Sequence, residues 1–170
     1  NVVRKIVKLL PGRHIVLNPE IDGNFPGRPP DPTNHENLSE LVRFVKEECM
    51  DLGFAFDGDG DRVVVVTPRG ECLQGDQLLA ILARDILRNN PGRNVVVDCK
   101  TSKMVTDSII KNGGIPILER SGHSIIKSKM LRTNAVLAGE MSGHMFISDR
   151  WYGFDDGVYT AIRLLEIYSK

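Results

Sequence analysis

The sequence predicts an α/β protein in which layers of helices cover a mixed, largely parallel sheet. In the second half of the chain, short apolar runs alternate with segments whose apolar residues recur at helical spacing. Short connections join them, and strand–helix alternation of this kind is typical of layered α/β/α sheets. In such sheets the loops at the carboxyl ends of the strands bind ligands, so we look for functional residues there.

The first part of the chain is less regular. We expect a helix at its start, a short strand over 13–20, and then a loop rich in Pro and Gly. Thr33 and Glu36 have the spacing of a capping box for the next helix. Strands are expected over 52–56 and 63–67, on either side of a loop that carries three aspartates.

A short strand at 72–73 follows, and we expect two domains, residues 1–71 and residues 72–170. In the second domain, Asp76 is expected to cap the first helix. The expected helices of this domain cover 76–90, 102–114, 124–133 and 155–170. The expected strands cover 94–100, 115–120, 135–140 and 144–149, and the last of them pairs back onto its neighbour.

Composition limits the classes of partner. The chain has 170 residues, 41% of them hydrophobic, and 22 basic residues balance 22 acidic ones. This balance provides no field that attracts nucleic acid or an anionic membrane. Charges interrupt the apolar run at the start of the chain, so we expect neither a signal peptide nor a membrane span there. The three cysteines lie far apart without metal-binding spacing, which indicates reduced thiols and a cytoplasmic protein.

Asp57, Asp59 and Asp61 alternate with glycines in the segment FAFDGDGDR. Carboxylates this close repel one another unless a cation lies among them. Oxygen ligands suit Mg²⁺, Mn²⁺ or Ca²⁺ rather than zinc, and the glycines let successive carboxylates turn toward one point. A calcium hand is excluded because Arg62 and Pro68 stand where it needs Gly and Glu. A solvated acidic turn is the alternative, but a hairpin turn needs only one Asp-Gly pair, so the spacing favours a metal loop.

Three single residues lie near the expected strand ends, and each of them has an ordinary interpretation. The Arg62 guanidinium is placed to bind a phosphate oxygen beside the metal, although it could simply offset the local negative charge. His123, in the segment SGHS, is by itself more typical of a helix start than of a catalyst. Lys100, in the segment DCKTS, is by itself typical of a solvated lysine.

The segment GEMSGH puts Glu140, Ser142 and His144 at the end of a predicted strand. A carboxylate, a hydroxyl and an imidazole in one loop can donate to and accept from neighbouring hydroxyl groups, as sugar recognition requires. The motif alone is only moderately specific, because His144 could be an ordinary polar residue at a strand start. The prediction of a site therefore depends on four strand-end loops that together carry groups for binding metal, phosphate and hydroxyls.

The motifs FAFDGDGDR, SGHS, AGEMSGH and WYGFDDG, in this order, resemble those of the α-D-phosphohexomutases, and in particular the bacterial phosphomannomutase/phosphoglucomutase branch. Met141 with Gly143 and His144 is the more specific part, because the phosphoglucosamine mutases typically have Gln in place of Met141. The resemblance covers nearly the whole chain. It implies a four-domain enzyme with repeated α/β/α domains, in which 1–71 belongs to the second domain and 72–170 is the third. The first domain, with a phosphoserine, and the fourth, which binds phosphate, would be missing parts of the same polypeptide.

The resemblance also implies an activity and roles for residues. Family members interconvert hexose 1-phosphates and hexose 6-phosphates, here of mannose and glucose, through a phosphoserine and a hexose 1,6-bisphosphate, which also acts as activator. Mg²⁺ would be held by Asp57, Asp59 and Asp61. The catalytic residues would be Arg62, His123 and His144. The substrate-binding residues would be Lys100, His123, Glu140, Met141, Ser142, Gly143 and His144.

Other functions stay open. A non-catalytic module that binds sugar phosphates or divalent metals would need the same loops, and a phosphoglucosamine mutase is the alternative within the family. A phosphatase with an aspartate nucleophile is disfavoured, because this chemistry starts its motif directly after a strand, and counted from Asp57 the position that it fills with Thr or Val holds Asp61. On its own the chain is expected to be inactive, since it carries no segment like the phosphoserine loop.

Overall fold

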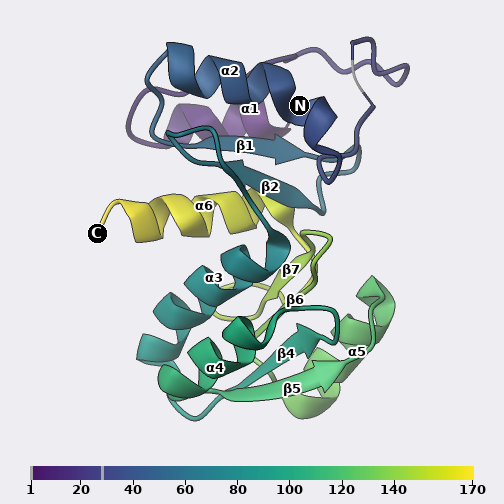
Figure 1. The fold of residues 1–170 in the computed structure, drawn as a ribbon, viewed down its shortest axis with the longest axis vertical. Coiled ribbons are helices and arrows are strands. Elements are labelled where there is room, and N and C mark those ends of the chain that lie inside the picture. The colour runs from purple at the N-terminus through teal and green to yellow at the C-terminus, as the bar shows by residue number, and fades with distance from the viewer. Residues whose placement is uncertain (1, 28) are drawn as a thin grey trace.

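The computed structural model describes residues 2–27 and 29–170 as two layered units joined end to end (Figure 1). The first unit carries a small antiparallel sheet, and the second carries a four-stranded mixed sheet between helices. The elements of the first unit are α1 (Val2–Ile6), η1 (Val7–Leu9), η2 (His35–Leu38), α2 (Ser39–Glu47), β1 (Gly53–Phe56), β2 (Val63–Val66) and β3 (Cys72–Leu73). Those of the second unit are α3 (Gly75–Asn89), β4 (Asn94–Asp98), α4 (Lys103–Lys111), β5 (Ile115–Glu119), α5 (His123–Thr133), β6 (Leu137–Gly139), β7 (Met145–Ile147) and α6 (Gly157–Tyr168).

The antiparallel sheet has the strand order β1-β2-β3. β2 is a run of four valines, and β-branched residues of this kind favour extended backbone. Gly53 allows α2 to lie close to β1, because a Cβ at Gly53 would be 2.6 Å from the Val45 side chain. Since β1 and β2 are antiparallel neighbours, the loop between them, residues 57–62, projects from one end of this sheet.

Two sequence-based predictions for the first unit are wrong. The segment 13–20 forms no strand, because β1 is the edge of the sheet and no strand within residues 2–27 and 29–170 pairs with that segment. Extended backbone needs partners for its N–H and C=O groups, so it does not persist as a strand alone. Asn34 rather than Thr33 caps η2, because the Asn34 side chain accepts the N–H of Glu36. Thr33 Oγ1 donates to Asp31 instead.

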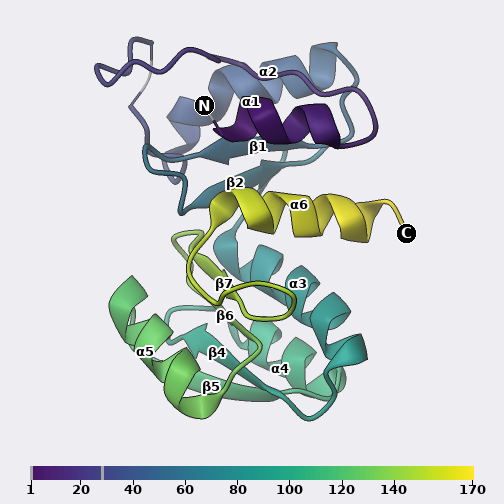
Figure 2. The same cartoon turned by 180° about the vertical axis from the view of Figure 1, so that it is seen from behind.

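The mixed sheet has the strand order β5-β4-β6-β7, in which β4 is parallel to β5 and β6 and only β7 runs antiparallel to its neighbour. Helices α3 and α4 cover one face, and α5 covers the other (Figures 1 and 2). Within β4, Val95 and Val97 belong to the core under α3 and α4, whereas Val96 packs with α5. This arrangement confirms the predicted α/β/α layers around a partly parallel sheet.

The start of α3 differs from the prediction. Gln74, not Asp76, is the N-cap, and reciprocal hydrogen bonds between Gln74 and Gln77 form a capping box. Gly75 packs against the backbone of the loop after β6, where an added Cβ would clash with the Glu140 carbonyl. The helix therefore begins at this tertiary contact, which no local pattern reveals.

One hydrophobic core runs through both units. Val63 and Val65 of β2 pack in the same cluster as Leu78 and Leu82 of α3 and Leu164 of α6. Figures 1 and 2 show α6 next to β2, on the side of the sheet away from α2. Because packed cores deform little, this shared core holds the loops of the two units in a defined relative position. In the part of the chain that the structure describes, none of the helices has the length and apolar character needed to cross a membrane.

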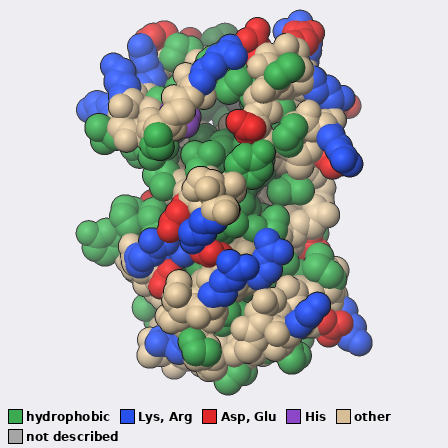
Figure 3. Space-filling model, turned by 90° about the vertical axis from the view of Figure 1, so that its left-hand side faces the viewer, with side chains coloured by type: hydrophobic (Ala, Val, Ile, Leu, Met, Phe, Trp, Pro, Cys, Tyr) green, Lys and Arg blue, Asp and Glu red, His purple; other side chains and the backbone are tan. Residues whose placement is uncertain are grey.

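A buried ion-pair network fastens α6 to the second unit. Arg163 is only 3% exposed, and its Nη2 lies 2.9 Å from Asp149 Oδ2 and 3.8 Å from Asp85 Oδ2 of α3. Arg163 Nη1 also donates to the Asp149 carbonyl, and Lys170 Nζ lies 3.2 Å from Asp85 Oδ1. Figure 3 shows basic and acidic side chains interspersed on this side of the molecule. A buried guanidinium requires such partners, so the network restricts where α6 can lie.

Candidate active site

The loop between β1 and β2 (residues 57–62, the aspartate loop) folds around one carboxylate. Asp57 Oδ1 accepts the backbone N–H groups of Gly60 (3.0 Å) and Arg62 (3.1 Å), and Asp57 Oδ2 accepts Nε–H of Arg62 (2.6 Å). Gly60 has a φ of +83°, which glycine adopts without strain. The turn brings together carboxylate oxygens that all lie within 4.8 Å of one another, from Asp57, Asp59 and Asp61.

The charges of the aspartate loop interact strongly. Burial disfavours the ionised form of Asp57, but hydrogen bonds from the Arg62 side chain and backbone outweigh it, so the pKa of Asp57 is lowered. Burial, the hydrogen bond with Asp57, and the charges of Asp57 and Asp59 raise the pKa of Asp61 to about 6. A divalent cation would relieve this repulsion, and the all-oxygen donor set fits Mg²⁺.

Two backbone contacts join the aspartate loop and the first residue of β2 to the second unit. The N–H of Val63 donates to the Gly143 carbonyl (3.3 Å), and the N–H of Gly157 donates to the Gly60 carbonyl (3.0 Å). Only glycine permits these approaches: a Cβ at Gly143 would lie 2.8 Å from Val63 O, and a Cβ at Gly157 would lie 2.7 Å from Arg62 O. The loop after β6 and the start of α6 are thereby held against the aspartate loop.

Residues 139–144 (the 139–144 loop) run from the last residue of β6 through the turn after it. Within this loop, the other polar side chains form hydrogen bonds around Glu140. Glu140 is 5% exposed; its Oε1 accepts the N–H of Gly122 (2.8 Å), and its Oε2 accepts the Ser142 hydroxyl (3.0 Å). His144 Nδ1 lies 2.8 Å from Ser142 Oγ and 3.2 Å from Glu140 Oε2. The three side chains singled out in GEMSGH therefore form one hydrogen-bonded group, which also holds the loop before α5.

Glu140 and His144 stabilise each other's charged forms. Burial disfavours the Glu140 carboxylate, but its bonds with His144, the Gly122 N–H and Ser142 lower the pKa of Glu140 below its ordinary value. Burial also disfavours the imidazolium, but the hydrogen bond with Glu140 and the charge of Asp61 raise the pKa of His144 above its ordinary value. His144 therefore holds a proton more firmly than an isolated histidine.

The aspartate loop and the 139–144 loop meet at His144, whose Nε2 lies 3.4 Å from Asp61 Oδ2. His123, the first residue of α5, stacks near His144 with 6.0 Å between ring centroids and 25° between the rings. His123 Nδ1 lies 3.3 Å from Asp155 Oδ2. Groups suited to metal, hydroxyl and proton binding thus lie in one small region.

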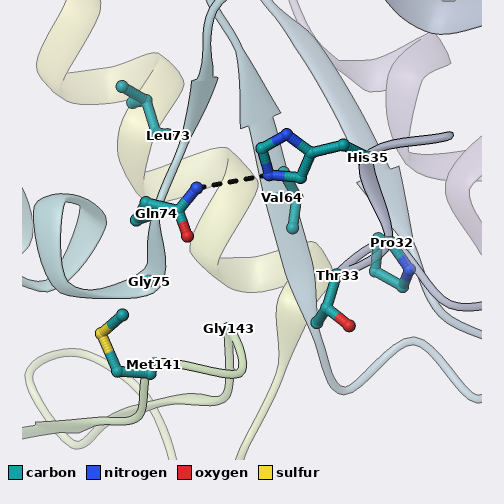
Figure 4. A pocket seen from close by; sticks show the side chains of 9 residues that line it. All are labelled: Pro32, Thr33, His35, Val64, Leu73, Gln74, Gly75, Met141 and Gly143. Atoms are coloured by element: carbon teal, nitrogen blue, oxygen red, sulfur yellow. Dashed lines mark hydrogen bonds between the residues drawn. The ribbon is translucent and has the colours of Figure 1, made fainter. Parts of the chain in front are cut away.

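The side chains of Lys100 and Met141 form none of the hydrogen bonds or ion pairs described above for this region. Lys100 is exposed in the turn after β4, and among the described residues no ion pair holds its Nζ. Met141 borders a small cavity between the units, together with Gly143, Gln74 and His35 (Figure 4). Gln74 Nε2 and His35 Nε2 lie 3.3 Å apart across one side of it. A cavity of about 30 Å³ admits one or two water molecules, so it is too small for a hexose phosphate.

Comparison with known families identifies the relatives of this arrangement. Residues 74–170 match the family model described as phosphoglucomutase/phosphomannomutase, alpha/beta/alpha domain III, and residues 1–70 match domain II of the same family. The chain belongs to the phosphoglucomutase/phosphomannomutase family. The family resemblance expected from the sequence motifs is confirmed.

Individual members of the phosphoglucomutase/phosphomannomutase family match at high identity. The chain is 50% identical over 169 residues to the phosphomannomutase/phosphoglucomutase of Pseudomonas putida, and the aligned segment covers 99% of this chain and 36% of that protein. It is 49% identical over 150 residues to the phosphoglucomutase of Neisseria gonorrhoeae, and the aligned segment covers 88% of this chain and 33% of that protein. A crystal structure of a family protein from Burkholderia thailandensis superposes with a TM-score of 0.85 at 48% identity, covering 87% of this chain and 32% of that one. The chain spans about a third of the length of the curated relatives it matches.

Three carboxylates at the site of this phosphoglucomutase/phosphomannomutase chain were not predicted from the sequence. Asp31 accepts Nη1–H of Arg62 (3.2 Å), Asp98 Oδ1 accepts a hydroxyl from the loop after β5 (2.7 Å), and Asp155 pairs with His123. Asp155 lies within the WYGFDDG motif, which is the one available signal. Local sequence does not distinguish a loop carboxylate that faces the site from one that faces solvent.

Proposed function

We propose that this chain forms the metal-binding and sugar-binding part of a phosphohexomutase that interconverts the 1-phosphates and 6-phosphates of mannose and glucose. The observation that carries the proposal is the 3.4 Å separation between Asp61 Oδ2 and His144 Nε2, because it puts an all-oxygen cluster beside a hydroxyl-binding group. The name of the Pseudomonas putida relative supports the same reaction. Two further domains, outside the matched domains II and III, would supply the phosphoserine and a phosphate-binding loop.

The aspartate loop would bind the metal and orient a phosphate ligand. Mg²⁺ held by Asp57, Asp59 and Asp61 would neutralise negative charge on the phosphoryl group. Arg62 would bind phosphoryl oxygens. Its Nε and Nη1 already donate to Asp57 and Asp31, so two carboxylates orient the guanidinium while further N–H groups stay available for phosphate. Phosphoryl transfer depends chiefly on such positioning and charge stabilisation.

The 139–144 loop would bind the sugar. In the free chain Glu140, Ser142 and His144 bond to one another, and sugar hydroxyls would replace these bonds with equivalent ones. Met141, Gly143 and Lys100 would complete the contacts. Because this loop would bind hydroxyls rather than a phosphate, it can hold the sugar with either end toward the phosphoserine.

His144 and His123 would carry protons to and from the reacting oxygens. His144 is suited to this because Glu140 orients its Nδ1 while its Nε2 faces the aspartate loop. The His123 side chain is 62% exposed and lies beside His144, so solvent reaches its ring.

We also propose that the domains cover residues 1–71 and 72–170. The matches to domains II and III, which end at residue 70 and begin at residue 74, support a boundary at this point. β3 follows the boundary and pairs with β2, so it adds a short strand to the sheet of the preceding domain.

The proposal is tested with a chimera in which residues 2–170 replace the matching segment of the Pseudomonas putida relative. With Mg²⁺ and the bisphosphate activator, the chimera should convert glucose 1-phosphate to glucose 6-phosphate, and the 170-residue chain alone should give no turnover. Asp59→Asn in the chimera should abolish turnover at ordinary Mg²⁺ concentrations, because the cluster loses a charged ligand. Asp107→Asn, on the exposed side of α4, is the matched control. A folded but inactive chimera would favour a non-catalytic binding module, and full activity of the Asp59→Asn chimera would exclude the aspartate loop as the metal site.

A further inference from the structure

A second group of metal-ligating atoms lies beside the aspartate loop. Oxygen atoms of Asp61 and Asp155 and a ring nitrogen of His144 all lie within 4.8 Å of one another. The three residues come from separate segments: the aspartate loop, the loop before β7 and the turn before α6. Backbone contacts hold these segments in register, because Arg62 bridges to His144 and Phe146 bridges to Asp155.

When His144 is neutral, the hydrogen bonds at its Nδ1 favour the tautomer that suits metal binding. Its Nδ1 is engaged by Ser142 Oγ at 2.8 Å and by the buried Glu140 carboxylate at 3.2 Å. A neutral imidazole that donates Nδ1–H to a carboxylate keeps its lone pair on Nε2. That Nε2 faces Asp61. A carboxylate–histidine pair of this kind commonly orients and strengthens a histidine metal ligand.

The spacing also suits a small transition-metal ion. Two ligands about 2.0–2.1 Å from a tetrahedral ion lie about 3.3 Å apart. The His144 Nε2 to Asp61 Oδ2 separation is 3.4 Å. The separation between these two atoms therefore fits a shared ion.

Asp155 contributes the least satisfied atom of the group. Its Oδ2 is buried and, within the described residues, accepts no hydrogen bond, although His123 Nδ1 lies 3.3 Å away as a possible ion-pair partner. A buried carboxylate oxygen without a hydrogen bond is costly, and a cation would satisfy it. His123 is mostly exposed and lies close enough to Asp155 to serve as a further ligand or to be displaced.

We propose that Asp61, His144 and Asp155 form a second cation site, selective for a transition-metal ion such as Zn²⁺ or Co²⁺, which shares Asp61 with the aspartate loop. Imidazole nitrogen favours these ions over Mg²⁺, whereas the oxygen-only aspartate loop favours Mg²⁺. The site goes beyond the proposed mutase function and does not depend on it, since it requires only the fold of this chain.

Co²⁺ absorption spectroscopy of the 170-residue chain in excess Mg²⁺ tests the site. Tetrahedral Co²⁺ with mixed nitrogen and oxygen ligands absorbs strongly in the visible range, whereas six-coordinate Co²⁺ with oxygen ligands absorbs weakly. We expect a strong band that saturates at one Co²⁺ per chain. Asp155→Asn and His144→Ala should weaken Co²⁺ binding by about tenfold or more and reduce the band. Asp59→Asn is the matched control, because Asp59 belongs only to the aspartate loop, and it should keep the band.

A weak six-coordinate spectrum would overturn the proposal. So would a band that is lost in Asp59→Asn and kept in Asp155→Asn, since it would place the ion in the aspartate loop. A second measurement covers the case in which the variants fail to fold. Zn²⁺ added to the wild-type chain in excess Mg²⁺ should shift the ¹⁵N resonance of His144 Nε2, and an unshifted resonance would exclude His144 as a ligand.

Discussion

The carbonyl of Gly143 accepts the N–H of Val63, and the two residues approach so closely that a Cβ on Gly143 would lie 2.8 Å from Val63 O. Gly143 also has a φ of +94°, in the region that favours glycine. This contact joins the 139–144 loop to the start of β2, directly after the aspartate loop. The relative position of the two loops therefore depends on the absence of one side chain.

Gly143→Ala should destabilise the chain by about 1–3 kcal/mol, because it combines backbone strain with a clash against a backbone oxygen. Gly92→Ala is the matched control. Gly92 also has a positive φ, +75°, but an added Cβ there would meet no atom within 4 Å, so only strain of about 1 kcal/mol is expected. Urea unfolding of both variants measures the difference. Equal losses would show that the close approach to Val63 contributes nothing.

The Arg163 network predicts that two arginines of the same region contribute very differently to the free energy of unfolding. Arg163→Met should cost about 3–5 kcal/mol, because it leaves the buried Asp85 and the largely buried Asp149 without their guanidinium. Arg150→Met should cost about 0–1 kcal/mol, since Arg150 pairs with Glu166 at the surface. Chemical denaturation of the two variants gives the free energies of unfolding. Similar small losses for both would show that the network does not hold α6 in place.

The pair of Arg150 and Glu166 predicts part of the acid sensitivity of the chain. The hydrogen bond from Arg150 lowers the pKa of Glu166 below its ordinary value of 4.5. A depressed carboxyl pKa contributes stability that is present above 4.5 and is lost as the pH falls through the lowered pKa. Glu166→Gln should therefore lower the melting temperature slightly at pH 7 and reduce its slope against pH below 4.5, so that the variant and the wild-type chain converge in acid. Glu47→Gln, at another exposed carboxylate, is the control, and an identical acid slope in the two variants would contradict the assignment.

Glu140→Gln in the Pseudomonas putida chimera tests sugar recognition. The amide keeps an oxygen that can accept the Gly122 N–H but loses the charge, and a hydrogen bond to a charged group contributes about 1.5–3 kcal/mol. We expect kcat/KM for mannose and glucose phosphates to fall alike, by roughly 10- to 150-fold. Steady-state kinetics with both sugars measures the ratio. A much larger fall in kcat/KM for one sugar than for the other would mean that Glu140 contacts the hydroxyl at C2, where the two sugars differ.

Much of the fold and one half of the site are predictable from sequence, because they depend on near neighbours in the chain. The apolar runs of β2 and β4 predict strands correctly, since hydrophobic period is a local property. Single glycines between Asp57, Asp59 and Asp61 confine three carboxylates to one turn for the same reason. The errors have the opposite origin: among the described residues, the segment 13–20 finds no strand to pair with. The cap of α3 is displaced to Gln74 because the helix starts against another loop.

Sequence by itself determined most of the elements, the family motifs and the cluster of aspartates, whereas only the tertiary structure decided which groups those aspartates face. Asp61, His144 and Asp155 lie in three separate segments, and no local pattern brings them within 4.8 Å. They meet because β2 shares a hydrophobic core with α3 and α6, and because glycines permit two backbones to touch. Turn and strand preferences act over a few residues, but a shared core forms between surfaces that exist only after the chain has folded.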